Sequence, residues 1–392
     1  MKLSCTARLR LAALPMIAML AGPALAEEPI VTESQLEELL RRANEQDSIG
    51  TTPLPPVEES ATGDGTADQG TAVPSRADKV NHRIPNPEEI DAAEYRDQPL
   101  PEGRSALTVK LQVLLDRAAM SPGVIDGYSG GMTGTALRAF ERQQNLPVDG
   151  VLDGEVWDAL GGAQVGQVTK AHVISPADVS QLTPGPLPND YAELAKLDRI
   201  GFTRVSEAIA EQYHMDEDFL IGLNPGLDWV AGETVTVVDV TRRREDAPLA
   251  RIVIDKPRSR LQALDVNGRV LSDYPVTIGS DGTPSPSGTH LVTAVAPDPT
   301  YSYNPDVNFQ QGDNTEFLTL PPGPNGPVGS TWIDLDKPTY GLHGTSEPSK
   351  LFTNQSHGCV RMTNWDAGEL ARMVTSRMQA DPGVEIEVVF VE

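Results

Sequence analysis

The sequence predicts a multidomain chain in which a mainly β domain follows a small domain of three helices. Apolar residues recur at helical spacing between residues 103 and 161, and short β-prone segments separated by turn residues run from 250 to 391. We expect the β domain to be a β-sandwich or a partly closed barrel with one peripheral helix. The 392 residues are enough for two or three domains of ~100–200 residues and their linkers.

Residues 1–26 have the pattern of a secretory signal peptide. Three basic residues precede an apolar stretch over 11–20, and the small-residue run Ala24-Leu25-Ala26 precedes Glu27. The alternative is a membrane anchor, but the stretch is shorter than the ~20 residues that span a bilayer. We expect cleavage after Ala26, export across the inner membrane, and a mature protein of the periplasm or cell wall without a membrane span.

Residues 27–102 are predicted to form an acidic tether rich in Pro and Gly, with one short amphipathic helix over 34–46. The whole chain carries a formal net charge of −25. A negative charge of this size argues against nucleic acid or an anionic membrane surface as the main partner.

The segment 103–161 is predicted to hold three helices. The first runs from the N-cap residue Ser105 to about Met120, the second lies around 133–140, and the third lies around 155–160. Ile125-Asp126-Gly127 and Val148-Asp149-Gly150 form a short internal repeat, and each supplies a turn before a helix. This segment resembles the peptidoglycan-binding domain of many bacterial wall hydrolases and transpeptidases, which implies that it binds peptidoglycan.

A possible glycan-binding module is predicted over 195–241. Residues 200–240 have the pattern helix, turn, helix, strand, ending in the alternating segment 234–238. Asn224-Pro225-Gly226 followed by Gly232-Glu233 resembles the end of a LysM module. The opening strand of such a module is weak in this sequence.

The β domain is predicted over 250–391. Its β-prone segments are 251–255, 261–266, 270–278, 289–295 and 384–391, separated by turns such as Asn267-Gly268. Thr363 and Asp366 form a capping box at the start of the one helix.

Cys359 is the only cysteine that remains once the signal peptide is removed. A free thiol in an oxidising compartment is open to mixed disulfides and oxidation, so its presence suggests a chemical use. The alternative is a buried cysteine that acts as a small hydrophobe. Two histidines lie nearby, in His343-Gly344-Thr345 and in Ser356-His357-Gly358-Cys359-Val360-Arg361-Met362. An imidazole that accepts the thiol proton makes cysteine an effective nucleophile.

Gly358 and Arg361 have candidate roles beside this nucleophile. Gly358 permits close backbone approach, so we expect amide N–H groups around Gly358 and Cys359 to form an oxyanion hole. Arg361 points to the same side as Cys359 if the stretch is extended, and its guanidinium suits a carboxylate. An ordinary surface ion pair is the alternative for Arg361.

These two motifs together resemble the signature of the L,D-transpeptidase (YkuD) catalytic domain, over about 250–391. The resemblance implies that Cys359 is the nucleophile, that His343 accepts and donates the proton, and that His357 shapes the oxyanion and substrate pocket. Ser356, Gly358, Arg361, Gly344 and Thr345 are then expected in the oxyanion or substrate-binding region. Many relatives carry Asn where this chain has Arg361, a variant also seen in the family, so the group that grips the substrate carboxylate stays open.

The resemblance also implies a reaction without a cofactor. Cys359 attacks the amide between the L-centre of diaminopimelate and the terminal D-Ala of a tetrapeptide stem, and an amine then resolves the thioester. The acceptor is a neighbouring stem, a lipoprotein lysine, a D-amino acid or water; water would make the protein an L,D-carboxypeptidase.

A zinc site, two other families of cysteine enzymes and a non-catalytic protein are the alternatives to this interpretation. Zinc bound by His343, His357 and Cys359 lacks an evident fourth ligand, so we assign no metal site. Papain-like peptidases place the cysteine before the histidine, and sortases place their arginine on a later strand. The remaining alternative is a non-catalytic wall-binding protein, and the presence of Cys359 argues against it.

Overall fold

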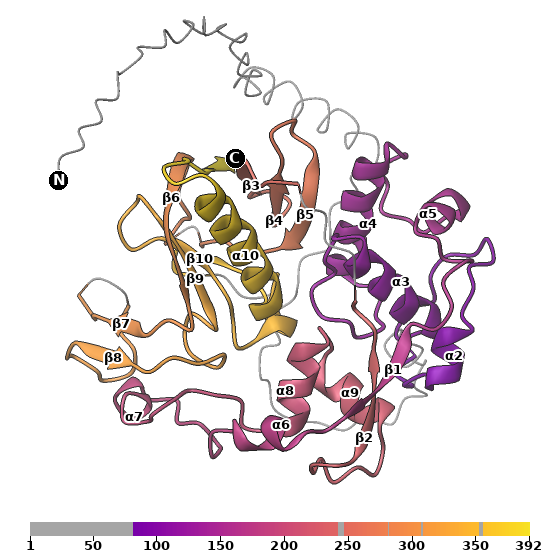
Figure 1. Ribbon diagram of the computed structural model, residues 1–392, viewed down its shortest axis with the longest axis horizontal. Coiled ribbons are helices and arrows are strands. Elements are labelled where there is room, and N and C mark those ends of the chain that lie inside the picture. Colours follow the sequence, from indigo (N-terminus) through magenta and orange to yellow (C-terminus); the bar gives the residue numbers. More distant parts are fainter. Residues whose placement is uncertain (1–80, 242–246, 281, 307–308, 353–355) are drawn as a thin grey trace, which may run out of the picture.

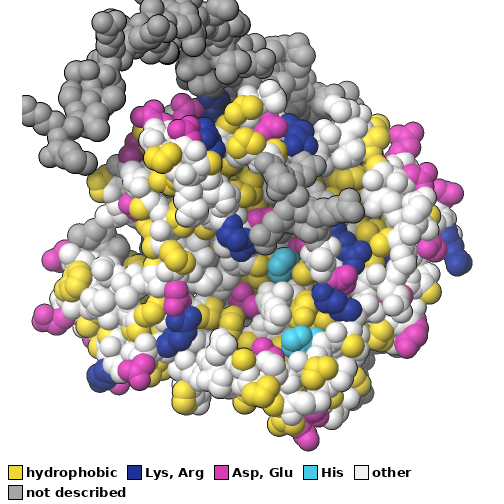
Figure 2. Space-filling model, viewed as in Figure 1, with side chains coloured by type: hydrophobic (Ala, Val, Ile, Leu, Met, Phe, Trp, Pro, Cys, Tyr) yellow, Lys and Arg dark blue, Asp and Glu magenta, His cyan; other side chains and the backbone are white. Residues whose placement is uncertain are grey.

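The structure is a computed structural model that describes residues 81–392 except 242–246, 281, 307–308 and 353–355 (Figure 1). The expected signal peptide, the helix over 34–46 and most of the expected tether lie outside these residues. Within the described part of the chain, no helix combines the length and the apolar character needed to cross a bilayer. On the face shown in Figure 2, basic and acidic side chains are interspersed and no broad basic patch is visible.

The predicted three-helix domain is confirmed. It contains α3 (Ala106–Arg117), α4 (Gly131–Gln144) and α5 (Gly154–Ala159). The Ser105 side chain caps α3 by accepting a hydrogen bond from the Thr108 amide. The three helices share a core that includes Leu111, Leu115, Leu137, Phe140 and Trp157, each at most 4 % exposed.

The tether prediction is wrong for its last part. Residues 87–91 form the helix α2 (Pro87–Asp91), which begins with a capping box between Asn86 and Glu89. Ile90 is fully buried. The Asp91 carboxylate accepts hydrogen bonds from the amides of Val168 and Thr169 at 2.8 and 3.0 Å. These contacts offset a polar composition that by itself favours an extended chain.

A second small unit has the order strand, helix, helix, strand. β1 (Thr169–Val173) pairs antiparallel with β2 (Thr234–Val238), and α8 (Val205–Gln212) and α9 (Glu217–Leu223) pack on them. The opening strand therefore precedes the expected start of the module at residue 195. A long insertion between β1 and α8 contains two short helices, α6 (Pro176–Ser180) and α7 (Tyr191–Leu194). Because this insertion separates β1 from the rest of the unit in sequence, β1 was not assigned to the module.

The C-terminal domain is the predicted partly closed barrel. Its eight-stranded sheet has the order β11-β10-β9-β6-β12-β3-β4-β5. The strands are β3 (Arg251–Asp255), β4 (Arg260–Leu264), β5 (Val270–Pro275), β6 (Gly288–Pro297), β9 (Thr331–Leu335), β10 (Gly341–His343), β11 (Val360–Arg361) and β12 (Glu387–Val391). Just after β5, Thr277 exchanges two backbone hydrogen bonds of 2.9 Å with Arg361 at the opposite edge. The two ends of the sheet therefore meet.

The predicted peripheral helix is α10 (Asn364–Ala380), capped by the Thr363 side chain. Its buried residues Ala367, Leu370 and Val374 join the core of the sheet. The helix lies across the sheet and approaches α8 at its N-terminal end (Figure 1).

The three-helix domain covers the edge strand β5. The Ser121 amide donates to the Asp273 carbonyl at 2.8 Å, and the Asp273 amide donates to the Ala119 carbonyl at 2.9 Å. Arg260 forms an ion pair with Asp273 in which both side chains are almost fully buried. Backbone groups that would be unpaired at a sheet edge are thus satisfied by the neighbouring domain.

Candidate active site

Two adjacent parallel strands bring the predicted histidine and cysteine motifs together. In the register of β10 and β11, Leu342 lies opposite Val360 and His343 lies opposite Arg361. Leu342 and Val360 are buried in the core. Because side chains alternate between faces along a strand, His343 and Arg361 lie on the other face, and so does Cys359 just before β11. Residues sixteen positions apart in sequence therefore share one surface of the sheet.

Cys359 is a partly exposed free thiol. Its Sγ lies 3.6 Å from the carbonyl oxygen of Thr339. Burial raises the pKa of the thiol above its ordinary value of 9.0, while the Gly341 amide and the charge of Arg361 act in the opposite direction. The resting group at neutral pH is therefore the thiol, which needs a base before it can attack.

His343 is a buried and neutral imidazole. It is 4 % exposed, and burial lowers its pKa to about 4, with Arg361 acting in the same direction. Its Nδ1 lies 2.7 Å from the carbonyl oxygen of Gly344. A carbonyl only accepts, so Nδ1 carries the proton and Nε2 keeps a free lone pair. The ring also stacks on Trp332, with centroids 5.6 Å apart, which fixes its plane.

Ser356 and Gly358 brace the turn that carries the cysteine. The Gly358 amide donates to Ser356 Oγ at 3.1 Å, and this hydroxyl donates in turn to the Cys359 carbonyl. The Gly358 N–H is therefore engaged, which conflicts with its expected use as an oxyanion donor. Gly358 has φ +112°, and a Cβ there would lie 2.8 Å from the Tyr340 ring. Only glycine fits this position without strain.

Arg361 lies within electrostatic reach of the predicted site residues. Burial lowers the pKa of His343 and of His357, and the charge of Arg361 adds to this effect; at Cys359 the same charge opposes the increase in pKa that burial causes. His357 is exposed and stacks on Phe309, with centroids 4.4 Å apart and planes 9° apart. Thr345, in contrast, accepts a hydrogen bond from the Glu347 amide at 3.2 Å, which is a local turn contact.

Sequence reasoning missed an aromatic cluster at this site. β7 (Tyr301–Tyr303) and β8 (Leu318–Leu320) form a separate two-stranded hairpin, and the chain between them supplies Phe309. Burial raises the pKa of Tyr301, and the charges of Tyr191 and of a Cys359 thiolate act in the same direction. The stack of Phe309 on His357 joins the cluster to the predicted site. The available signal was three aromatic residues within nine positions of a chain that is only 5 % aromatic.

No group of three or more His, Cys, Asp or Glu side chains is arranged to hold a metal ion within the described residues. His343, His357 and Cys359 do not form such a group.

Comparisons with known proteins agree with the motifs. A family model described as "L,D-transpeptidase catalytic domain" (YkuD) matches residues 250–388, and one described as "Putative peptidoglycan binding domain" matches residues 104–160. The protein named "Putative L,D-transpeptidase YkuD" of Bacillus licheniformis is 30% identical over 171 residues, which are 43% of this chain and 87% of that protein.

Two further matches are more distant. "Probable L,D-transpeptidase YbiS" of Escherichia coli is 27% identical over 191 residues, or 46% of this chain and 62% of that protein. Among solved structures, an L,D-transpeptidase from Mycobacterium smegmatis is 18% identical with a TM-score of 0.29, over 41% of this chain and 66% of that one.

Proposed function

The chain belongs to the L,D-transpeptidase (YkuD) family, and on that premise we propose that it is an exported enzyme that remodels peptidoglycan through a thioester on Cys359. One observation carries this proposal. A partly exposed thiol and a buried neutral imidazole share one face of two adjacent strands, and the Gly344 carbonyl holds the imidazole in the tautomer that a base requires.

The first half of the reaction forms the thioester. His343 Nε2 takes the proton from Cys359 as Sγ attacks the carbonyl carbon between the L-centre of diaminopimelate and the terminal D-Ala of a tetrapeptide stem. The C–N bond then breaks, and the same proton passes to the departing amine of D-Ala. Because both groups are neutral at rest, attack and proton transfer are coupled.

The second half resolves the thioester. An incoming amine attacks the acyl carbon while His343 takes its proton, and the thiolate of Cys359 leaves and is reprotonated. A side-chain amine of a neighbouring stem gives a cross-link, a lipoprotein lysine gives an anchored protein, and a D-amino acid gives an exchanged stem. Water gives a tripeptide.

The surrounding groups have distinct roles in this proposal. The Cys359 amide is the oxyanion donor, since the Gly358 amide is held by Ser356. Arg361 supplies the positive charge for the stem carboxylate, and His357 borders the same surface. Thr345 belongs to the turn that supports this surface.

Export and wall attachment complete the proposal. The signal peptide over 1–26 delivers the enzyme to the periplasm or cell wall. The peptidoglycan-binding domain then keeps it near its substrate, with the LysM-like unit as a second glycan contact. Binding to the wall raises the local concentration of stem peptides around Cys359, so enzyme and substrate meet more often without any change in the chemistry.

Two other functions compete on the same scaffold. A hydrolytic L,D-carboxypeptidase would use the same Cys359 and His343 and differ only in the acceptor. A non-catalytic wall-binding protein would have no need for a thiol beside a buried base, so the geometry of Cys359 and His343 favours an enzyme.

The test is to incubate the mature protein with purified disaccharide-tetrapeptide and to follow the products by mass spectrometry. A dimer, a tripeptide or an exchanged tetrapeptide names the acceptor. Cys359→Ser keeps the size of the side chain but weakens the nucleophile, and we expect it to lower the rate about 10³-fold or more. Undiminished product from a folded Cys359→Ser protein would refute the cysteine mechanism.

A further inference from the structure

The insertion between β1 and α8 reaches the hairpin that borders the active site. In Figure 1, α7 lies next to β8 at the far end of the molecule from the three-helix domain. Tyr191, the first residue of α7, makes edge contacts with Tyr303, Tyr301 and Phe309, with centroids 5.2, 6.1 and 6.1 Å apart. One side chain from outside the matched residues 250–388 thus lies among three of the aromatic residues of the hairpin region.

Polar contacts fix the start of α7 to the chain between β7 and β8. The Tyr191 amide donates to Gln311 Oε1 at 3.2 Å, and Gln311 Nε2 donates to the Asn189 carbonyl at 2.8 Å. Asn314 Nδ2 donates to Asp190 Oδ2 at 3.1 Å. Backbone, side chain and ring contacts therefore all specify one position of α7 on the hairpin.

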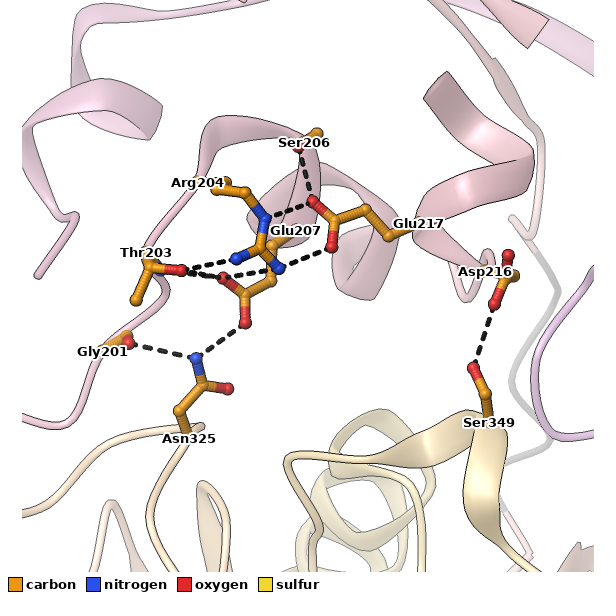
Figure 3. Close-up of polar contacts among 9 residues, drawn as sticks. All are labelled: Gly201, Thr203, Arg204, Ser206, Glu207, Asp216, Glu217, Asn325 and Ser349. Atoms are coloured by element: carbon orange, nitrogen blue, oxygen red, sulfur yellow. Dashed lines mark hydrogen bonds and ion pairs between the residues drawn. The ribbon is translucent and has the colours of Figure 1, made fainter. Parts of the chain in front are cut away.

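The rest of the insertion is docked on the same domain. Arg199 pairs with Asp298, and the Ile200 amide donates to the Pro322 carbonyl at 2.9 Å. Figure 3 shows where the docking continues: Asn325 Nδ2 donates to Glu207 Oε1 at 2.7 Å. These contacts fix the chain that follows α7 on the same domain. The position of α7 on the hairpin therefore does not depend on the aromatic rings alone.

The cluster continues to the proposed catalytic surface. Phe309 makes an edge contact with Tyr191 and also stacks on His357. Burial raises the pKa of Tyr191, and the charge of Arg361 acts in the opposite direction, which is consistent with the ring contacts that link this tyrosine to the site. Tyr191, Phe309 and His357 therefore form a continuous row that ends two residues from Cys359.

We propose that Tyr191 is a positioning residue of the active site: it holds Phe309 against His357 and so sets the aromatic surface beside Cys359 on which a donor stem lies. The kinetic part of this inference rests on the proposed function, whereas the structural part does not. It follows that the start of α7, although it precedes the catalytic domain in sequence, borders the substrate-binding surface of that domain.

The structural part is tested by the NMR signals of His357 in the full mature chain. A ring stacked on an imidazole shifts the imidazole proton signals upfield, and a His357→Gln variant identifies those signals by their loss. We expect Tyr191→Ala to move them toward the values of an exposed histidine and Tyr191→Phe to leave them in place, because phenylalanine keeps the ring. Unmoved His357 signals in Tyr191→Ala would overturn the proposal, whatever the activity of the protein.

The kinetic part is tested with the tetrapeptide assay. We expect Tyr191→Ala to lower kcat/KM about 10-fold to 100-fold, mainly through KM, and Tyr191→Phe to restore most of it. Arg199→Ala is the matched control, since it removes a contact of the same insertion away from the aromatic cluster, and it should change kcat/KM by less than about threefold. An equal loss in Arg199→Ala would show that docking in general, and not Tyr191, matters.

The rate of Cys359 alkylation by iodoacetamide tests whether Tyr191 affects the thiol itself. The proposal expects this rate and its pH dependence to be unchanged in Tyr191→Ala, because Tyr191 acts on the stem and not on the thiol. A changed alkylation profile would overturn the assignment of Tyr191 to substrate positioning and would indicate a general disturbance of the site.

Discussion

At the scale of single residues, the protonation states of Cys359 and His343 decide how the site works. Burial raises the pKa of the thiol and lowers the pKa of the imidazole to about 4. The resting pair is then thiol and neutral imidazole, and not the thiolate and imidazolium that form where the pKa of the thiol lies below that of the imidazole. A neutral pair costs less to bury and becomes charged only when substrate is attacked.

This protonation state predicts the pH dependence of acylation. A base acts only when unprotonated, so the acid limb of kcat/KM should lie near pH 4, the lowered pKa of His343, instead of near the ordinary 6.5. Arg361 lowers this pKa, so Arg361→Gln should raise it and move the acid limb to higher pH. The measurement is a pH profile of D-Ala release. An acid limb that stays in place in Arg361→Gln would contradict the proximity of Arg361 to His343.

Gly358 gives a second prediction at this scale, with a control elsewhere in the chain. Gly358→Ala combines a strained positive φ with a contact of 2.8 Å to Tyr340, whereas Gly383, at φ +105°, has nothing near its Cβ position. Both alanine variants should lose about 1–3 kcal/mol of unfolding free energy through strain. Only Gly358→Ala should also lose acylation per folded molecule, measured by active-site titration of Cys359. Equal activity in the two variants would contradict a tight fit at Gly358.

At the scale of elements, the sequence predicts those helices and strands whose formation is determined by a local residue pattern. The helices around Leu111 and Phe140 have apolar residues at helical spacing, the first also has the N-cap residue Ser105, and both helices were predicted. Cys359 and His343 were assigned as partners because their motif is specific. The strands that bring them together are short, since β10 has three residues and β11 has two. Such strands exist through their neighbours and carry almost no periodic signal of their own.

What the sequence does not predict is set by contacts distant along the chain. The start of the small strand-helix-helix-strand unit was missed because β1 and its partner β2 are separated by sixty residues. α2 was assigned to a tether, since the burial of Ile90 and the hydrogen bonds of Asp91 arise only on docking. Tyr191 was overlooked for the same reason. Its role depends on where the insertion lies, and not on a motif.

At the scale of the whole molecule, a group of carboxylates lies where the three units meet. Glu211 of α8 accepts a hydrogen bond from Asn364 at the start of α10, and Asp366 accepts one from Ser121 of the three-helix domain. Both line a cavity of about 490 Å³ at this junction. Burial raises the pKa of Glu211 to about 8 and that of Asp366 to about 6. The folded arrangement thus favours the protonated form of both.

This junction predicts the direction in which stability changes with pH. A carboxyl group whose pKa is raised in the folded state contributes stability that is fully present below its ordinary pKa, here 4.5 for Glu211, and lost as pH rises through the folded value near 8. The unfolding temperature should therefore fall between about pH 5 and pH 8 by a few degrees. Calorimetry of the mature chain measures this slope.

Glu211→Gln removes the titrating group and keeps the hydrogen-bonding shape. We expect it to raise the unfolding temperature at pH 8 and to leave it nearly unchanged at pH 5, so that the slope becomes smaller. Glu141→Gln is the matched control, because burial also raises the pKa of Glu141, to about 7, but this residue lies within the three-helix domain. If only Glu141→Gln makes the unfolding temperature less dependent on pH, the group responsible lies in the three-helix domain and not at the junction of the three units.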